Sequence, residues 1–545
     1  MKTIMISVLT ICVMLADAVW AAQYPNTNSP LGTNVAAIAD WNSELYFFDV
    51  ARCWRGWENH GVTEGLMPPE QVDESGYPKY VNPDQNITIG WLNQSKPAGK
   101  YLVTWDGEAT FTEHRQGPNA CQIVERGNNW LVINGIAKEW WGLRLTSTNP
   151  NNHIRNLHIY APGFWDEATH ALKPGHDANN PWHPEYLKTL SRFSTIRFLD
   201  WMPINIDPEE TRKYGVPVEW KDLKPANWWT WVSDGSAVHF HKYRHTGPAP
   251  CIRLCNALHA NCWLPVPHRL SDNAVRKLAE YVRDNLNPDL EVIVEYGNEC
   301  WNWGAAWAVP TQYCVDKSRE LGIGDWGDGY YALRSIQIWK IFNDVFGNRA
   351  NKVKKVLSWQ RGSTYGFNLM YSLVIDKPQW NPNNIRPDYL AWAPYFSNFN
   401  PEGAKISPSI GLEPFMDEVI NKIVPLNCTE MAELARYAAQ RGAKPVCYEA
   451  GQHFFPGSPQ DVEFYASVNR HPKMKPACIN YLNTWLKHSN NGLMCWWQST
   501  GLWGQYGYWG FKEYWNQPRS EAPKYDAIMT VIEEVAGPAP AVSSP

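Results

Sequence analysis

The sequence lacks most of the motifs that mark the common enzyme classes. It has no glycine-rich loop to cradle a phosphate, no Gly-x-Ser-x-Gly elbow and no His-Glu-x-x-His zinc motif. The formal net charge of −5 is small for 545 residues, which argues against nucleic acid or an anionic membrane as the main partner. We therefore expect neither a metal ion nor an organic cofactor.

Long apolar runs are also missing, except at the N-terminus. There Met1-Lys2 precedes an apolar stretch over residues 4–15, and small residues follow, which is typical of a cleavable secretory signal rather than a membrane span. We expect residues 1–21 to be this signal and the remaining chain to be secreted, extracellular, soluble and monomeric. Three sequons allow N-glycosylation in a eukaryotic host, at Asn86, Asn93 and Asn427.

Cysteine and histidine give no clear metal site. Of twelve cysteines, Cys12 lies in the signal, and the odd number left predicts some disulfides and at least one free thiol. A metal clip is the alternative for Cys251, Cys255 and Cys262, but no second pair has matching spacing, so disulfides or buried thiols are favoured. Solvated or substrate-facing side chains are likewise favoured over zinc ligands for His239, His241 and His245.

Tryptophan, by contrast, is abundant. The chain has 31 tryptophans, and many fall in predicted loops. Flat sugar faces stack on flat aromatic rings, so loop tryptophans suit a polysaccharide groove, whereas ordinary core packing is the alternative. We favour the core for Trp392 and the groove for Trp301 and Trp303. The further groove candidates lie at other predicted strand ends: Trp201, Trp496, Trp497 and Trp503.

Apolar strand-like runs alternate with helical patterns along most of the chain. Eight runs predict strands: Leu31–Ile38, Thr195–Trp201, Asn261–Pro265, Glu291–Glu299, Val353–Trp359, Tyr389–Tyr395, Lys444–Glu449 and Leu493–Gln498. Eight strands separated by helices predict an α/β fold, the (β/α)8 TIM barrel.

A different pattern interrupts the barrel after its first strand. Short alternating runs such as Tyr101-Leu102-Val103-Thr104-Trp105 predict an inserted or accessory antiparallel β-sandwich. The predicted organisation is a signal at 1–21, the first barrel strand and its loop at 22–72, the sandwich at 73–165, the rest of the catalytic barrel at 166–536 and a disordered tail at 537–545.

Two predicted barrel strands end in glutamate, Glu299 on the fourth and Glu449 on the seventh. The carboxyl ends of barrel strands meet at the face where barrel enzymes do their chemistry. Retaining glycosidases hold two carboxyl groups about 5 to 5.5 Å apart, one to protonate the leaving oxygen and one to attack the anomeric carbon. The pair therefore predicts glycoside cleavage, although each glutamate alone could be a surface residue.

Other side chains at strand ends fit the same chemistry. Asn298 is placed to bond the sugar hydroxyl beside the reacting carbon. Tyr395 and Arg197 could each bond the nucleophile carboxylate and keep it ionised. His268, after the third strand, and His453, after the seventh, are candidate substrate contacts.

These residues resemble the clan A superfamily of retaining glycoside hydrolases. In that group an Asn-Glu pair ends strand four and a glutamate ends strand seven, matched here by Asn298-Glu299 and Glu449. Tyr395, Arg197 and either Trp496 or Trp497 fall where the group has its tyrosine, arginine and tryptophan of strands six, two and eight. The resemblance implies Glu299 as acid/base and Glu449 as nucleophile.

The sequence as a whole predicts a secreted retaining glycoside hydrolase, endo-acting on a β-linked polysaccharide of glucan, mannan or xylan type. The alternative is a secreted, lectin-like protein whose barrel mouth binds glycan without cutting it.

Overall fold

The computed structural model describes residues 29–538, except 61–63, 90–95, 116–120, 136–140, 206–214, 234–244, 305–306, 361 and 400–402. The predicted signal, nearly all of the predicted tail, Asn93, His239 and His241 lie outside these residues. The chain divides into two compact units. One contains residues up to 35, 188–222 and 251–545, and the other contains 36–187 and 223–250.

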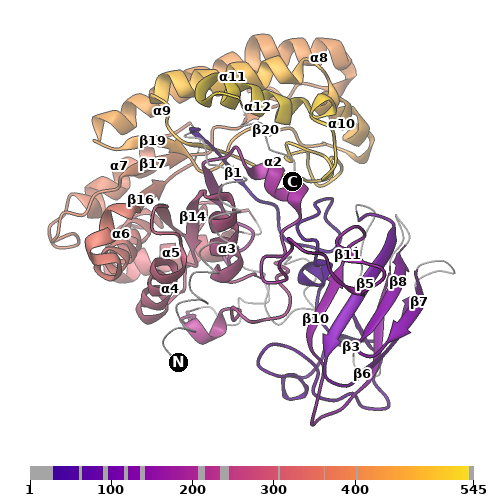
Figure 1. Ribbon diagram of the computed structural model, residues 1–545. Helices are drawn as coiled ribbons and strands as arrows, with labels where there is room; N and C mark the ends of the chain where they lie inside the picture. The colour runs from indigo at the N-terminus through magenta and orange to yellow at the C-terminus, as the bar shows by residue number, and fades with distance from the viewer. Residues whose placement is uncertain are drawn as a thin grey trace. The chain divides into compact units, whose positions relative to one another are not determined.

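The first unit is a closed parallel barrel, which confirms the predicted (β/α)8 fold (Figure 1). Its strands, in barrel order, are β1 (Leu31–Asn34), β13 (Thr195–Arg197), β14 (Asn261–Val266), β15 (Val292–Tyr296), β16 (Val353–Ser358), β17 (Tyr389–Trp392), β19 (Lys444–Cys447) and β21 (Met494–Trp496). Strand β21 pairs with both β19 and β1, which closes the ring.

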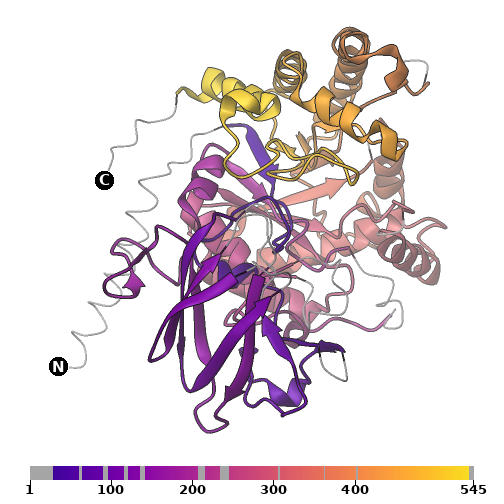
Figure 2. The same ribbon diagram turned by 90° about the vertical axis from the view of Figure 1, so that its right-hand side faces the viewer.

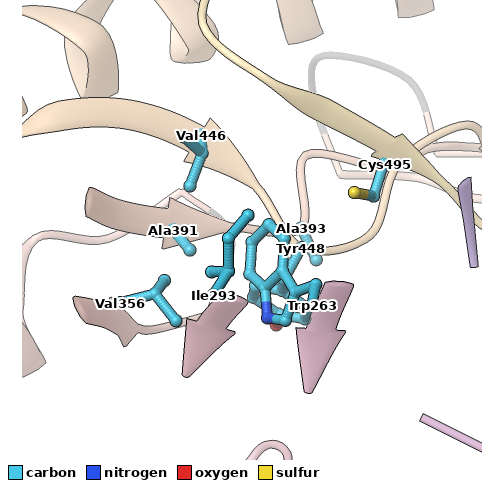
Figure 3. Close-up of a cluster of buried hydrophobic side chains, with 8 residues drawn as sticks. All are labelled: Trp263, Ile293, Val356, Ala391, Ala393, Val446, Tyr448 and Cys495. Carbon is cyan, nitrogen blue, oxygen red and sulfur yellow. The ribbon is translucent and has the colours of Figure 1, made fainter. Parts of the chain in front are cut away.

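Side chains from successive strands fill the barrel interior. Figure 3 shows one cluster, made of Trp263, Ile293, Val356, Ala391, Ala393, Val446, Tyr448 and Cys495. Because parallel strands are covered on both faces, they need nearly continuous apolar runs, and such runs are the pattern that identified them in the sequence.

The strands are shorter than the apolar runs that predicted them. Strand β15 ends at Tyr296 and β19 at Cys447, so Glu299 and Glu449 lie on the turns that follow rather than on the last strand residues. Side chains along a strand alternate between its two faces, but residues of a turn need not. Both glutamate side chains can therefore point into the open end of the barrel.

Helices cover the outside of the barrel. They are α3 (Pro248–Leu258), α4 (Asp272–Asn285), α5 (Ala308–Leu321), α6 (Asp328–Phe346), α7 (Tyr365–Met370), α8 (Leu412–Glu418), α9 (Val424–Gln440), α10 (Val462–Arg470), α11 (Met474–Ser489) and α12 (Pro523–Ala536). Helix α2 (Pro184–Leu190) is divided between the two units at Leu187. Helix α11 packs between α9 and α12 (Figure 1).

Helix α4 shows how the sequence specifies these elements. Ser271 caps its first turn by accepting a hydrogen bond from the Ala274 amide, and its apolar residues recur on one buried face. Within the described ranges, no helix has both the length and the apolar content needed to cross a membrane.

The second unit holds two antiparallel sheets, whose strands are purple and indigo in Figure 2. One sheet has the order β10 (Arg155–Tyr160), β5 (Gly99–Asp106), β8 (Trp130–Gly135), β7 (Cys121–Gly127). The other has the order β3 (Glu64–Leu66), β2 (Glu58–His60), β4 (Ile87–Ile89), β9 (Trp141–Thr148), β6 (Ala109–Arg115). Rings from the two sheets meet, with the centroids of Tyr101 and Trp141 5.0 Å apart.

This unit is larger than the predicted insertion. Strands β2 and β3 precede residue 73, where the sequence places the start of the sandwich. Residues 223–250, from the long connection between the second and third barrel strands, also belong to the unit. Isolated three-residue strands carry too little periodicity to be recognised without their partners.

The structure differs from the sequence predictions on disulfides and on one glycosylation sequon. All eleven cysteines from Cys53 to Cys495 are free thiols, so the predicted disulfides are absent from the described chain. Most are buried as small apolar side chains, and burial raises the pKa of Cys53 and of Cys478 to about 12, which keeps these thiols unreactive. The sequon residue Asn427 is 2% exposed in α9, which leaves no room for a glycan.

Candidate active site

Glu299 lies on a sharp turn after β15. Gly297 and Glu299 both have positive φ, of 63° and 47°, a conformation that is uncommon for a residue other than glycine. Backbone strain of this kind clusters at functional sites. The turn leaves the Glu299 side chain partly exposed, where it accepts hydrogen bonds from the Tyr448 hydroxyl at 2.7 Å and the Asn302 amide at 2.8 Å.

Glu449 lies two residues beyond β19 and is 7% exposed. Its Oε1 accepts a hydrogen bond from Arg197 Nη1 at 2.8 Å, and its Oε2 accepts one from the Tyr395 hydroxyl at 2.9 Å. The structure thus places Arg197 and Tyr395 against the carboxylate that the sequence expects them to contact. The guanidinium and the phenol fix this carboxylate in position, and both lower its pKa in opposition to the burial that raises it.

Arg197 is the centre of the buried network. Besides Glu449, it donates to Asn298 Oδ1 at 2.8 Å, to Asn34 Oδ1 at 3.1 Å and to Glu295 Oε2 at 2.9 Å. Because the Asn298 oxygen is taken by Arg197, its amide NH2 is left as a donor. Burial by itself lowers the pKa of Arg197, but Glu295 and Glu449 outweigh it and raise that pKa overall.

The two candidate catalytic carboxyls influence each other. Burial and the negative charge of Glu299 raise the pKa of Glu449, while Arg197 and Tyr395 act in the opposite direction. Two carboxyls that interact in this way titrate as a pair, so one proton is retained at a pH where two isolated carboxyls would both be ionised.

Sequence reasoning missed four polar residues of this network: Asn34, Glu295, Asn302 and Tyr448. Glu295 had a signal, since a lone charge inside the apolar run Val292–Tyr296 must be paired if the strand is buried. Asn34 is the last residue of β1, and polar residues near the ends of other barrel strands were the ones predicted to form the site. Tyr448 and Asn302 resemble ordinary neighbours of the glutamates, and only the folded chain shows their contacts.

Three of the groove candidates are buried, which corrects the sequence interpretation. Trp201 is 0% exposed, Trp496 2% and Trp503 5%. The Trp496 ring packs against Tyr481 of α11, with centroids 6.4 Å apart, so it supports the barrel wall and offers no face to a sugar. Trp497, the next residue, is partly exposed.

Trp301 and Trp303 follow Glu299 but differ in environment. Trp301 is partly buried against the barrel core and lies 4.9 Å from the Trp359 ring, whereas Trp303 is 53% exposed. Trp392, expected in the core, is 0% exposed.

The two candidate histidines also differ. His268 is 2% exposed, and burial lowers its pKa to about 3, so its ring is neutral. His453 is exposed, lies 5.3 Å from the Tyr395 ring, and accepts a hydrogen bond from Trp509 Nε1 at 3.2 Å. Of these two histidines, His453 is the one exposed to solvent. Over the described ranges, no group of three or more His, Cys, Asp or Glu side chains could hold a metal ion.

No family model and no curated protein matches the chain. Solved structures that match include an endo-1,4-beta-xylanase from Penicillium canescens, with 10% identity and a TM-score of 0.34 over 65% of this chain and 91% of that chain. Another is a psychrophilic glycoside hydrolase family 10 endo-beta-1,4-xylanase, with 7% identity and a TM-score of 0.34 over 63% of this chain and 92% of that chain. A third is a beta-glucosidase from Thermotoga maritima, with 11% identity and a TM-score of 0.34 over 64% of this chain and 84% of that chain.

These neighbours are named as glycoside-cleaving enzymes, the group whose motifs the sequence resembles. At such identities and TM-scores the likeness carries no argument about activity. The barrel assignment rests on the strand pairing, and any function must be argued from the site.

Proposed function

We propose that the chain is a retaining glycoside hydrolase with Glu299 as acid/base and Glu449 as nucleophile. One observation carries the proposal: two coupled carboxyls at the barrel mouth have unequal surroundings. Glu449 contacts the Arg197 cation, whereas Glu299 contacts two neutral donors. The Arg197 cation stabilises negative charge on Glu449, as a nucleophile requires, whereas Glu299 has no cation in contact among these partners. Paired carboxyls whose environments separate their roles are the arrangement that glycoside cleavage requires.

In the first step a Glu449 oxygen attacks the anomeric carbon while Glu299 gives its proton to the departing glycosidic oxygen. The bond between carbon and that oxygen breaks, leaving a glycosyl ester on Glu449. In the second step ionised Glu299 takes a proton from water, the water oxygen attacks the same carbon, and Glu449 is released. The free amide NH2 of Asn298 donates to the neighbouring sugar hydroxyl in both steps.

For the substrate we propose a β-linked polysaccharide of glucan, mannan or xylan type, cut within the chain by a secreted enzyme. The support comes from exposed rings on loops that follow four barrel strands. Trp303 is 53% exposed, Phe399 48%, Phe455 47% and Tyr506 83%. Rings spread over several loops suit an open groove that binds several sugars, whereas an exo-enzyme needs a closed pocket.

The test of the roles is a pair of substitutions. Glu449→Ala should abolish turnover of every substrate, because no nucleophile remains. Glu299→Ala should stop cleavage of polymers yet spare aryl glycosides whose leaving group needs no protonation. Azide should rescue both variants, and NMR should show glycosyl azides of opposite anomeric form. Equal cleavage of an unactivated polymer by wild type and Glu299→Ala would show that the acid assignment is wrong.

Reducing-sugar release from glucans, mannans, xylans and algal polysaccharides identifies the substrate. Early release of mixed oligosaccharides supports endo cleavage, while monosaccharide alone contradicts it. Retained binding with no release from any polymer would favour the lectin-like alternative.

A further inference from the structure

A third carboxylate, Glu295, lies beneath the proposed catalytic pair. We infer that Glu295 is a positioning residue. Its carboxylate partly neutralises the positive charge of Arg197, and this keeps one proton on the Glu299–Glu449 pair at the working pH. The inference rests on the proposed function and extends it to a residue outside the motifs that suggested that function.

Glu295 is buried and enclosed by hydrogen-bond donors. It is 0% exposed, and Arg197 Nε and Trp263 Nε1 each donate to its Oε2 at 2.9 Å. The Ser358 hydroxyl donates to Oε1 at 2.8 Å. Both oxygens are thus occupied by donors, one of them the Arg197 cation, and contacts of this kind stabilise negative charge on a carboxylate.

Arg197 divides its charge between two carboxylates. Its Nη2 lies 2.9 Å from Glu295 Oε2, and its Nη1 lies 2.8 Å from Glu449 Oε1. If Glu449 were the sole partner, the full positive charge would favour ionisation of both catalytic carboxyls. With Glu295 present, the ionised pair would leave the cluster with two uncompensated negative charges, so the pair retains one proton.

The phenols and thiols around the cluster carry no charge at neutral pH. Glu295 is faced by Tyr331 of α6, Cys300 of the following turn and Cys495 of β21, and Glu449 is faced by Tyr395, Tyr448 and Cys495. Burial raises the pKa of these phenols and of Cys495, and that of Cys300 is raised by its hydrogen bond with Cys314 and by burial. Arg197 and the three glutamates therefore determine the local charge.

Glu295→Gln tests the inference because it removes the charge and keeps the shape. The amide oxygen can accept from Arg197 and Trp263, and the amide NH2 can donate to Ser358, whose hydroxyl then accepts. Without the negative charge, both carboxyls of the pair should ionise more easily. Both limbs of the pH profile of kcat/KM on an aryl glycoside should move to lower pH by about one to two units.

Ser358→Ala is the matched control, since it removes one hydrogen bond from Glu295 without changing its charge. It should lower the rate by a similar factor at every pH and leave both limbs in place. A Glu295→Gln profile with unshifted limbs overturns the inference, whatever its height. An inactive wild type, or an active Glu449→Ala, would instead overturn the proposed function.

A measurement on the wild type covers the case in which Glu295→Gln does not fold. In protein labelled with δ-13C glutamate, Glu299→Gln and Glu449→Gln assign the two catalytic carboxyls by loss of their signals. Glu44→Gln and Glu58→Gln assign the other buried glutamates in the same way. The buried signal that remains, that of Glu295, should stay ionised while the pair titrates in two steps. A Glu295 signal that itself takes up the proton near neutral pH overturns the inference.

Discussion

At the scale of single residues, the buried Glu449 carboxyl lowers the free energy of unfolding at neutral and alkaline pH. Burial and Glu299 raise the pKa of Glu449 above its ordinary value of 4.5, so the folded state holds a proton that the unfolded chain releases. As the pH rises above 4.5, the unfolded chain loses this proton first, and folding becomes less favourable. The loss of stability is complete once the pH passes the raised pKa.

Glu449→Gln should therefore be a stabilising substitution that abolishes activity. We expect no gain in the free energy of unfolding below pH 4.5 and a gain of roughly 1–3 kcal/mol at pH 8. Thermal or urea unfolding across this pH range measures it. Glu534→Gln, at an exposed position of α12, is the control and should show no such pH dependence. A gain that is constant with pH would contradict the explanation.

At the scale of elements, the turn after β15 determines where Glu299 points. Gly297 has a φ of +63°, and a Cβ added there would lie 2.5 Å from Cys300 Sγ. A side chain at this position is thus opposed both by the backbone conformation and by the packing beneath the turn.

Gly297→Ala should lower the free energy of unfolding by roughly 2–3 kcal/mol and reduce kcat on polymer at least tenfold, because Glu299 moves with the turn. Gly322→Ala is a matched control: this glycine ends α5 at a φ of +65°, and its Cβ would meet nothing within 4 Å. It should cost about 1 kcal/mol without changing kcat. Unfolding and steady-state kinetics decide, and equal losses of kcat in both variants would contradict the role of the turn.

At the scale of the whole molecule, most of the tryptophan content serves the core. Nine of the twelve largest fully buried side chains are tryptophans. Of the two tryptophans that follow Glu299, Trp303 is the exposed ring, at 53%. The groove interpretation thus rests on fewer rings than the sequence suggests.

Trp303→Ala should weaken polymer hydrolysis several-fold more than hydrolysis of a short aryl glycoside, because remote sugar binding is lost. Its thermal stability should stay unchanged, as the ring is exposed. Trp326→Ala, at 62% exposure between α5 and α6, is the control and should affect neither substrate. Equal losses on both substrates, or a lowered Tm, would instead indicate a supporting role for Trp303.

Much of the barrel could be predicted from the sequence alone. Buried parallel strands need continuous apolar runs of limited length, and such runs are a local property that any chain displays. The placement of Glu299 and Glu449 beyond two of those runs followed from the same local pattern. Given a barrel, the carboxyl ends of its strands must share one face.

Only the tertiary structure decided which side chains pair. Glu295 bonds Arg197 across 98 residues of sequence, and Tyr448 bonds Glu299 across 149. Such contacts arise from closure of the barrel, which no local pattern records. The burial of Trp496 and the absence of disulfides among the described cysteines could not be predicted from the sequence for the same reason. Burial and pairing depend on the neighbours that folding brings together rather than on a residue's own chemistry.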